Sequence, residues 1–147
     1  MRQDKKITNY FIGLLIIVVL DGALTLSIGT RSIIYLAKGI WIAPIIQFIP
    51  LIFFATLFAI ETIFITKYFK NCEKYKKAGL ENFRFKALKE IEDKNIKKFK
   101  KTIIVNYIAC GLTVCLGFLG LVPLFFMISG TKQYNFDRLI EQNKNNK

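Results

Sequence analysis

Three long apolar segments dominate this sequence of 147 residues. Residues 7–28 and 40–66 carry one charge each, Asp21 and Glu61, and residues 102–129 carry none. At a rise of 1.5 Å per residue, about 20 helical residues cross the ~30 Å hydrocarbon core of a bilayer. Helices that are apolar on all faces otherwise need a protein shell, which a chain of this length cannot supply. The pattern predicts an all-α, polytopic membrane protein, a single membrane domain over 1–147 with three transmembrane helices.

The boundaries of these segments leave alternatives open. The second span could begin as early as residue 33, and Pro44 and Pro50 lie within it, where we expect a kink rather than a break. Between Gly117 and Pro123, helix-breaking residues could divide the third run into a re-entrant hairpin. A split or re-entrant segment would raise the count from three to four. For the first run, we expect an uncleaved anchor, because it exceeds the apolar length of a usual signal peptide.

Lysine and arginine predict the orientation. Three precede the first span, two lie between the first and second, thirteen lie in residues 67–101, and four follow residue 130. Cytoplasmic loops are enriched in these residues, so we expect a multi-pass protein of the cell membrane with the N-terminus and residues 67–101 in the cytoplasm. With three spans, the polar tail over 130–147 would lie outside. A re-entrant third segment would return it to the cytoplasm.

The loop over 67–101 carries a net charge of +8, two thirds of the net charge of the chain. Apolar residues recur at helical spacing over residues 80–92, which predicts a basic amphipathic helix. Such a helix can lie on anionic lipid, or instead remain in solvent or pack on the mouth of the bundle. The lysines expected to contact anionic lipid headgroups or an acidic partner are Lys86, Lys89, Lys94, Lys97, Lys98, Lys100 and Lys101. We do not expect nucleic-acid binding, because no nucleic-acid-binding motif accompanies the charge.

Groups suited to catalysis are scarce. The sequence has no histidine, which removes the commonest general base and the usual zinc patterns. Cys110 and Cys115 are five residues apart and point to different sides of a helix, so we expect them to pack rather than to bind a metal. No phosphate-binding glycine loop or nucleophile elbow occurs. We therefore expect no enzyme activity, no catalytic or metal site, and no cofactor.

Polar residues within the apolar runs are the remaining candidates, since ionisable groups in hydrocarbon are costly and are often functional. They are Asp21, Glu61, Asn106 and Tyr10. Measured from the expected cytoplasmic ends of the spans, Asp21 lies about 21 Å deep and Glu61 about 7 Å deep. We therefore expect no direct pair between these carboxyl groups. Glu61 lies level with Asn106 and Tyr10, and a hydrogen bond to either would join helices.

Two functions fit these features. The first is a small non-enzymatic accessory, regulatory or assembly factor that docks on a membrane protein or on copies of itself, with its basic loop on lipid or on an acidic partner. The second is an oligomeric channel, holin-like pore or proton-coupled transporter in which Asp21 and Glu61 face a wet interior. The first explains the lack of catalytic groups. The second explains the membrane carboxylates.

Overall fold

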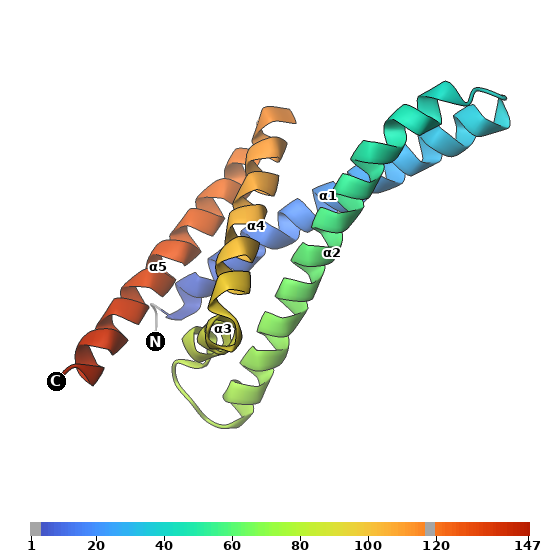
Figure 1. The fold of residues 1–147 in the computed structure, drawn as a ribbon. Helices are drawn as coiled ribbons and strands as arrows, with labels where there is room; N and C mark the ends of the chain where they lie inside the picture. Colours follow the sequence, from blue (N-terminus) through green and yellow to red (C-terminus); the bar gives the residue numbers. More distant parts are fainter. Residues whose placement is uncertain (1–3, 117–119) are drawn as a thin grey trace.

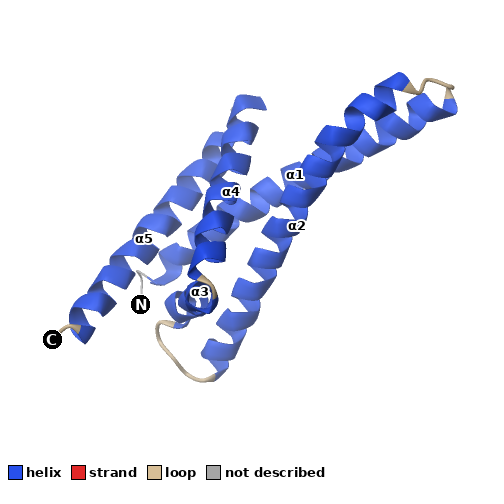
Figure 2. Ribbon diagram, in the orientation of Figure 1, coloured by secondary structure: helices blue, strands red, loops and turns tan. Residues whose placement is uncertain are grey.

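The computed structural model describes residues 4–116 and 120–147, and within them every regular element is a helix (Figures 1 and 2). A short 3₁₀ turn, η1 (Asp4–Lys6), leads into α1 (Ile7–Ala37) and then α2 (Ile42–Lys77). The remaining helices are α3 (Phe83–Lys94), α4 (Ile96–Leu116) and α5 (Leu121–Asn145). The expectation of an all-α protein is confirmed.

Helices α1 and α2 form a long antiparallel hairpin whose tip extends beyond the other helices (Figure 1). Both end at a glycine with a positive φ of 75°, Gly39 and Gly79. At each end the amide that follows the glycine bonds back across the turn, Ile40 to Tyr35 O (2.9 Å) and Leu80 to Tyr75 O (3.3 Å). Glycine adopts this left-handed conformation without strain, and it stops a helix in this way.

Both helices are longer than the apolar runs within them. Arg31 continues α1 past residue 28, and the lysines after residue 66 continue α2 to Lys77. Arginine and lysine are good helix formers, so loss of hydrophobicity does not end a helix. Pro50 lies inside α2, and α2 continues through it as a single helix.

The third apolar run is not one helix, contrary to the prediction of a span over 102–129. Helix α4 ends at Leu116 and α5 begins at Leu121, and Gly117, one of the expected breaking residues, lies outside the described residues. The Tyr107 hydroxyl donates to Met127 O (3.1 Å), and the Cys110 thiol to Gly120 O (3.7 Å). These contacts mean that α5 runs back along α4, in agreement with the alternative of a hairpin.

Two glycines bring α5 into close contact with α1. A Cβ on Gly130 would lie 2.8 Å from the Cα atom of Tyr10, and a Cβ on Gly13 would lie 2.5 Å from the carbonyl oxygen of Pro123. Any side chain at either position would therefore separate the two backbones. Small residues allow this approach between membrane helices, where packing and not water drives association.

The direction of α5 places the polar tail beside α3 and the N-terminus, not at the opposite end as three spans require. Arg138 donates to Glu92 of α3 (2.9 Å), and Lys89 of α3 pairs with Glu141. Asp4 accepts a hydrogen bond from the Phe85 amide (3.0 Å). Among the described residues, only Arg31 and Lys38 carry positive charge toward the tip of the α1–α2 hairpin.

Helices α1 and α2 are each long and apolar enough to cross a membrane. Their outer surfaces are strongly apolar, since Leu26 is 73% exposed and Ile49 is 75% exposed. The buried core lies nearer the other end of the hairpin, where Phe11 stacks on Tyr68 with ring centroids 3.6 Å apart. The hairpin tip therefore projects without a protein covering.

Replacing Gly130 by alanine tests the α1–α5 contact. The new methyl group would overlap the Tyr10 backbone, so Gly130→Ala should lower the free energy of unfolding in detergent by about 1–3 kcal/mol. Gly111→Ala is the matched control, because no atom lies within 4 Å of the position that its Cβ would take. This control should leave stability unchanged or raise it by up to ~1 kcal/mol. Equal effects from both variants would contradict the packing described above.

Candidate functional site

Three polar side chains are completely enclosed in the apolar half of the bundle. Asp21 on α1, Glu61 on α2 and Asn106 on α4 are each at most 1% exposed. Tyr10 on α1, which is 2% exposed, joins them. All four polar residues expected from the sequence are thus buried, and three helices supply them.

The carboxyl groups of Asp21 and Glu61 lie near enough to interact electrostatically, although no hydrogen bond joins them in the described residues. The expectation that they lie far apart in depth is therefore wrong, although they form no hydrogen-bonded pair. The depth argument measured each residue from the expected cytoplasmic end of its own apolar run. In the structure, the short turn after Ala37 fixes which residues of α1 and α2 face each other. Ser32 bonds to Gln47 (2.8 Å), and Gly22 faces Phe58 further along the same hairpin. Asp21 and Glu61 continue this register.

Asn106 and Tyr10 form the second half of the polar group. The Asn106 amide donates to the Tyr10 hydroxyl at 2.9 Å, which links α4 to α1. The hydrogen bond considered from Glu61 to either residue is not formed, although Glu61 lies near enough to Tyr10 and Cys110 to interact electrostatically. Among the described residues, no partner is found for Asp21 Oδ2, for either Glu61 oxygen or for Asn106 Oδ1.

The chemistry open to this group is limited. Two carboxyl groups at close range can share one proton, and buried polar atoms without a partner are uncommon in native proteins. Within the described part of the chain, no three histidine, cysteine, aspartate or glutamate side chains come together as metal ligands. The group can therefore hold a proton or join helices.

A second region lies at the basic end of the bundle, where α3 packs across the other helices. Its side chains Phe85, Ala87 and Leu88 are buried, and Tyr134 and Arg138 of α5 both donate to Glu92. The interpretation in which α3 lays an apolar face on lipid is thus wrong for this face, because protein covers it. The alternative of packing on the mouth of the bundle holds.

Two of the lysines expected to contact lipid or a partner form ion pairs within the described part of the protein, and the other five do not. Lys89 pairs with Glu141, and Lys94 pairs with Glu90 (3.3 Å). The other five are exposed: Lys86, Lys97, Lys98, Lys100 and Lys101. Only Lys94 and Lys98 of the seven lie in the cleft described next.

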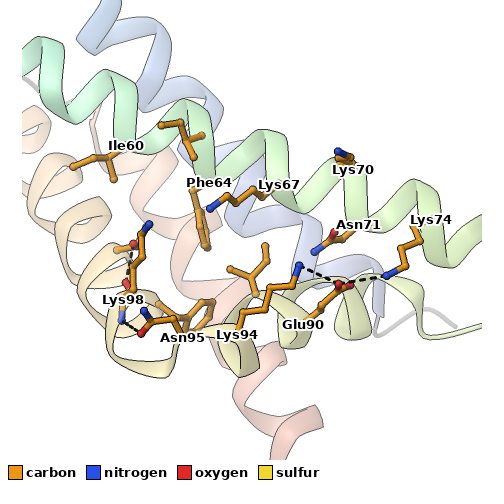
Figure 3. Close-up of a pocket in the computed structure, with 14 residues that line it drawn as sticks. Ile60, Phe64, Lys67, Lys70, Asn71, Lys74, Glu90, Lys94, Asn95 and Lys98 are labelled. Atoms are coloured by element: carbon orange, nitrogen blue, oxygen red, sulfur yellow. Dashed lines mark hydrogen bonds and ion pairs between the residues drawn. The ribbon is translucent and has the colours of Figure 1, made fainter.

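A cleft of about 880 Å³ opens between α2 on one side and α3 and α4 on the other (Figure 3). Five lysines line it, three of them from α2, namely Lys67, Lys70 and Lys74. Sequence reasoning did not select these three, because the second span was ended at residue 66. Their spacing of three and four residues would have placed them on one face had the helix been continued.

The apolar part of the cleft is its inner end. Phe64 and Phe99 are almost fully buried, with ring centroids 6.0 Å apart, and they form the floor. Ile60 and Ile63 of α2 line the wall nearest the apolar half of the bundle. The cleft thus changes from apolar to cationic along α2.

One carboxylate, Glu90, lies in the cleft and holds two of its lysines. Its oxygen is 3.4 Å from Lys74 and 3.3 Å from Lys94. Partial burial opposes ionisation of Glu90, but hydrogen bonds from Tyr75, Lys94 and Lys74 outweigh it and hold the pKa of this carboxyl below its usual range. No carboxylate among the described residues lies within 4 Å of the ammonium groups of Lys67, Lys70 and Lys98.

Comparison of the chain with protein-family models, with curated proteins and with solved structures finds no match. Its function must therefore be argued from its own residues and their geometry.

Proposed function

We propose that this chain is a small non-enzymatic accessory protein of the cell membrane, whose basic end associates with anionic lipid headgroups on the cytoplasmic face. The observation that carries the proposal is the segregation of charge along the bundle. Positive charge is concentrated around α3 and both termini, while the α1–α2 hairpin beyond it is apolar on its outer surface. Anionic lipid attracts such clusters when they lie next to a membrane segment.

The membrane part of the proposal follows from the exposed apolar surface. Leu26, Ile49 and Phe125 are each more than 70% exposed, on α1, α2 and α5. Apolar exposure spread over several helices would drive aggregation in water, whereas in hydrocarbon it has no such cost. We therefore infer two spans, α1 and α2, instead of the three expected from the sequence.

Helices α4 and α5 fit a re-entrant hairpin. The apolar part of α4 covers residues 102–116, about 22 Å of helix, which is too short to cross the hydrocarbon core. Antiparallel α5 returns the chain to the basic end. This arrangement places the tail in the cytoplasm and removes the charge imbalance that three spans leave outside.

An accessory role also needs a partner in the membrane. The uncovered hairpin tip offers apolar surface for another membrane protein or a second copy of the chain. Purification in mild detergent with mass spectrometry of the bound proteins would identify either one. A monomer that copurifies with no membrane protein would contradict the accessory role.

Anionic lipid should stabilise the protein. In nanodiscs at low salt, replacing part of the zwitterionic lipid by phosphatidylglycerol should raise Tm by at least about 3 °C. High salt should reduce the gain, because it screens exposed charges. Reversing the charge of Lys94, Lys97, Lys98, Lys100 and Lys101 to glutamate should abolish it. An unchanged Tm across lipids would reject lipid contact by the basic end.

Labelling of single cysteines in intact cells should report the topology. In a variant with Cys72, Cys110 and Cys115 replaced by alanine, an impermeant maleimide should label a cysteine at position 38, because the hairpin tip is then outside. Cysteines at positions 86 and 144 should react only after the membrane is permeabilised. Labelling at position 144 in intact cells would mean that the tail crosses, and labelling at 86 would invert the orientation.

The adjacency of Asp21 and Glu61 favours a second candidate function, an oligomeric proton-coupled channel or transporter. If it is correct, proteoliposomes should dissipate a pH gradient. Asp21→Asn with Glu61→Gln should then lower the rate at least about tenfold, because an amide does not ionise and cannot relay a proton as a carboxyl group does. Serine in place of the exposed Cys115 is the control. Absence of flux from the unaltered protein would reject this function.

A further inference from the structure

We propose that the cleft between α2 and α3–α4 is a binding site for one anionic phospholipid, with the lysines around the phosphate and the acyl chains along Ile60 and Ile63. This inference rests on the proposed membrane function and narrows it to one site and one ligand class. The cleft combines cationic and apolar surface within a single cavity at the basic end of the apolar bundle.

Three lysines are available for the phosphate. Figure 3 shows Lys67 of α2 and Lys98 of α4 reaching toward each other from opposite walls of the cleft. Lys70 stands one helical turn beyond Lys67 on α2. Since Glu90 binds Lys74 and Lys94 and not these three, their charge is uncompensated by the described residues. An ammonium group binds phosphate as a point charge.

The apolar end of the cleft favours a lipid over a soluble anion as the ligand. Phe64 and Phe99 provide a buried floor, while Ile63 is 55% exposed and faces outward on α2. From Ile60 to Lys74 the cleft wall follows about 21 Å of helix. That length accommodates a headgroup together with the first part of its acyl chains. Inorganic phosphate would leave the apolar part empty.

Three neutral hydrogen-bonding groups in the cleft bond to the protein itself, so charge should dominate recognition. The Asn71 amide donates to Ala87 O (3.3 Å), and Asn95 Oδ1 accepts from the Lys98 amide (3.1 Å). The Thr102 hydroxyl donates to Lys98 O (2.8 Å). The site should therefore prefer phospholipids with net negative charge over zwitterionic ones, and should distinguish poorly among anionic headgroups.

Native mass spectrometry of the full chain in mild detergent tests the site, with phosphatidylglycerol as the anionic probe and phosphatidylcholine as the zwitterionic one. The first phosphatidylglycerol should bind the cleft variant, Lys67→Gln with Lys70→Gln and Lys98→Gln, at least about tenfold more weakly than the unaltered protein. The control, Lys76→Gln with Lys132→Gln and Lys147→Gln, removes the same charge from exposed positions outside the cleft and outside the lysines assigned to lipid contact. Its affinity should stay within about twofold.

A second variant and a competitor separate lipid from free phosphate. Ile63→Gln keeps every lysine. It should also weaken the binding of phosphatidylglycerol, because the acyl chains lose their contact with the Ile63 side chain. Excess inorganic phosphate at constant ionic strength should not displace the lipid. Displacement by phosphate, with Ile63→Gln unchanged, would make this an anion site and overturn the lipid assignment.

Equal weakening by the cleft variant and its control would overturn the site while leaving general lipid contact by the basic end intact. Equal binding of phosphatidylcholine and phosphatidylglycerol to the unaltered protein would overturn both the site and the proposed function. Tm and size-exclusion profiles of all variants should match those of the unaltered protein, since the exchanged side chains are exposed.

Discussion

The backbone contact between α1 and α5 determines where the rest of the chain can lie. Gly13 and Gly130 let α5 approach until its backbone touches that of Tyr10 and its Pro123 carbonyl meets α1. With α5 held along α1, its last turns reach the same end of the bundle as η1. Glu92, Tyr134 and Arg138 can then join α3 to α5, and Asp4 can join η1 to α3. The arrangement of the cationic end of the molecule therefore depends on the contact between α1 and α5.

The cleft arises from two further consequences. Because α3 is held between α5 and α2, its apolar residues face protein, Lys89 pairs with Glu141 of α5, and its other lysines and Glu90 face outward or toward α2. Helix α2 continues past its apolar part to Lys77, and this extension supplies the opposite wall. An anion that enters the cleft between these lysines would offset their mutual repulsion. Glu90 compensates only two of them.

Several features could be predicted from the sequence because they depend on local pattern. Helical structure, two helices long and apolar enough to cross a membrane and an amphipathic helix near residues 80–92 follow from hydrophobic periodicity and charge. Asn106 and Tyr10 were predicted to lie at the same depth by counting from nearby helix ends, and they are hydrogen-bonded in the structure. Membrane insertion of these helices stays a prediction.

Other features depended on contacts distant in sequence. The depth argument for Asp21 and Glu61 failed because a tight turn at Gly39, not a common boundary, sets the register between α1 and α2. The sequence left the direction of α5 open between a third span and a re-entrant hairpin, and the contacts of α5 with α4 and of Gly130 with Tyr10 decide it. Gly111 of α4 is equally small, but no atom lies within 4 Å of the position that its Cβ would take.

Phe64 connects the two candidate sites. One side of its ring lines the cleft beside Phe99, and another meets Tyr10 in an edge contact with centroids 6.3 Å apart. Tyr10 in turn accepts the hydrogen bond of Asn106, next to Glu61 on the helix that carries Phe64. A truncation of Phe64 would therefore disturb both the cleft and the packing of Tyr10. Exposed lysines and Ile63 change the cleft alone, because none of them touches the polar group, and they allow the two sites to be separated.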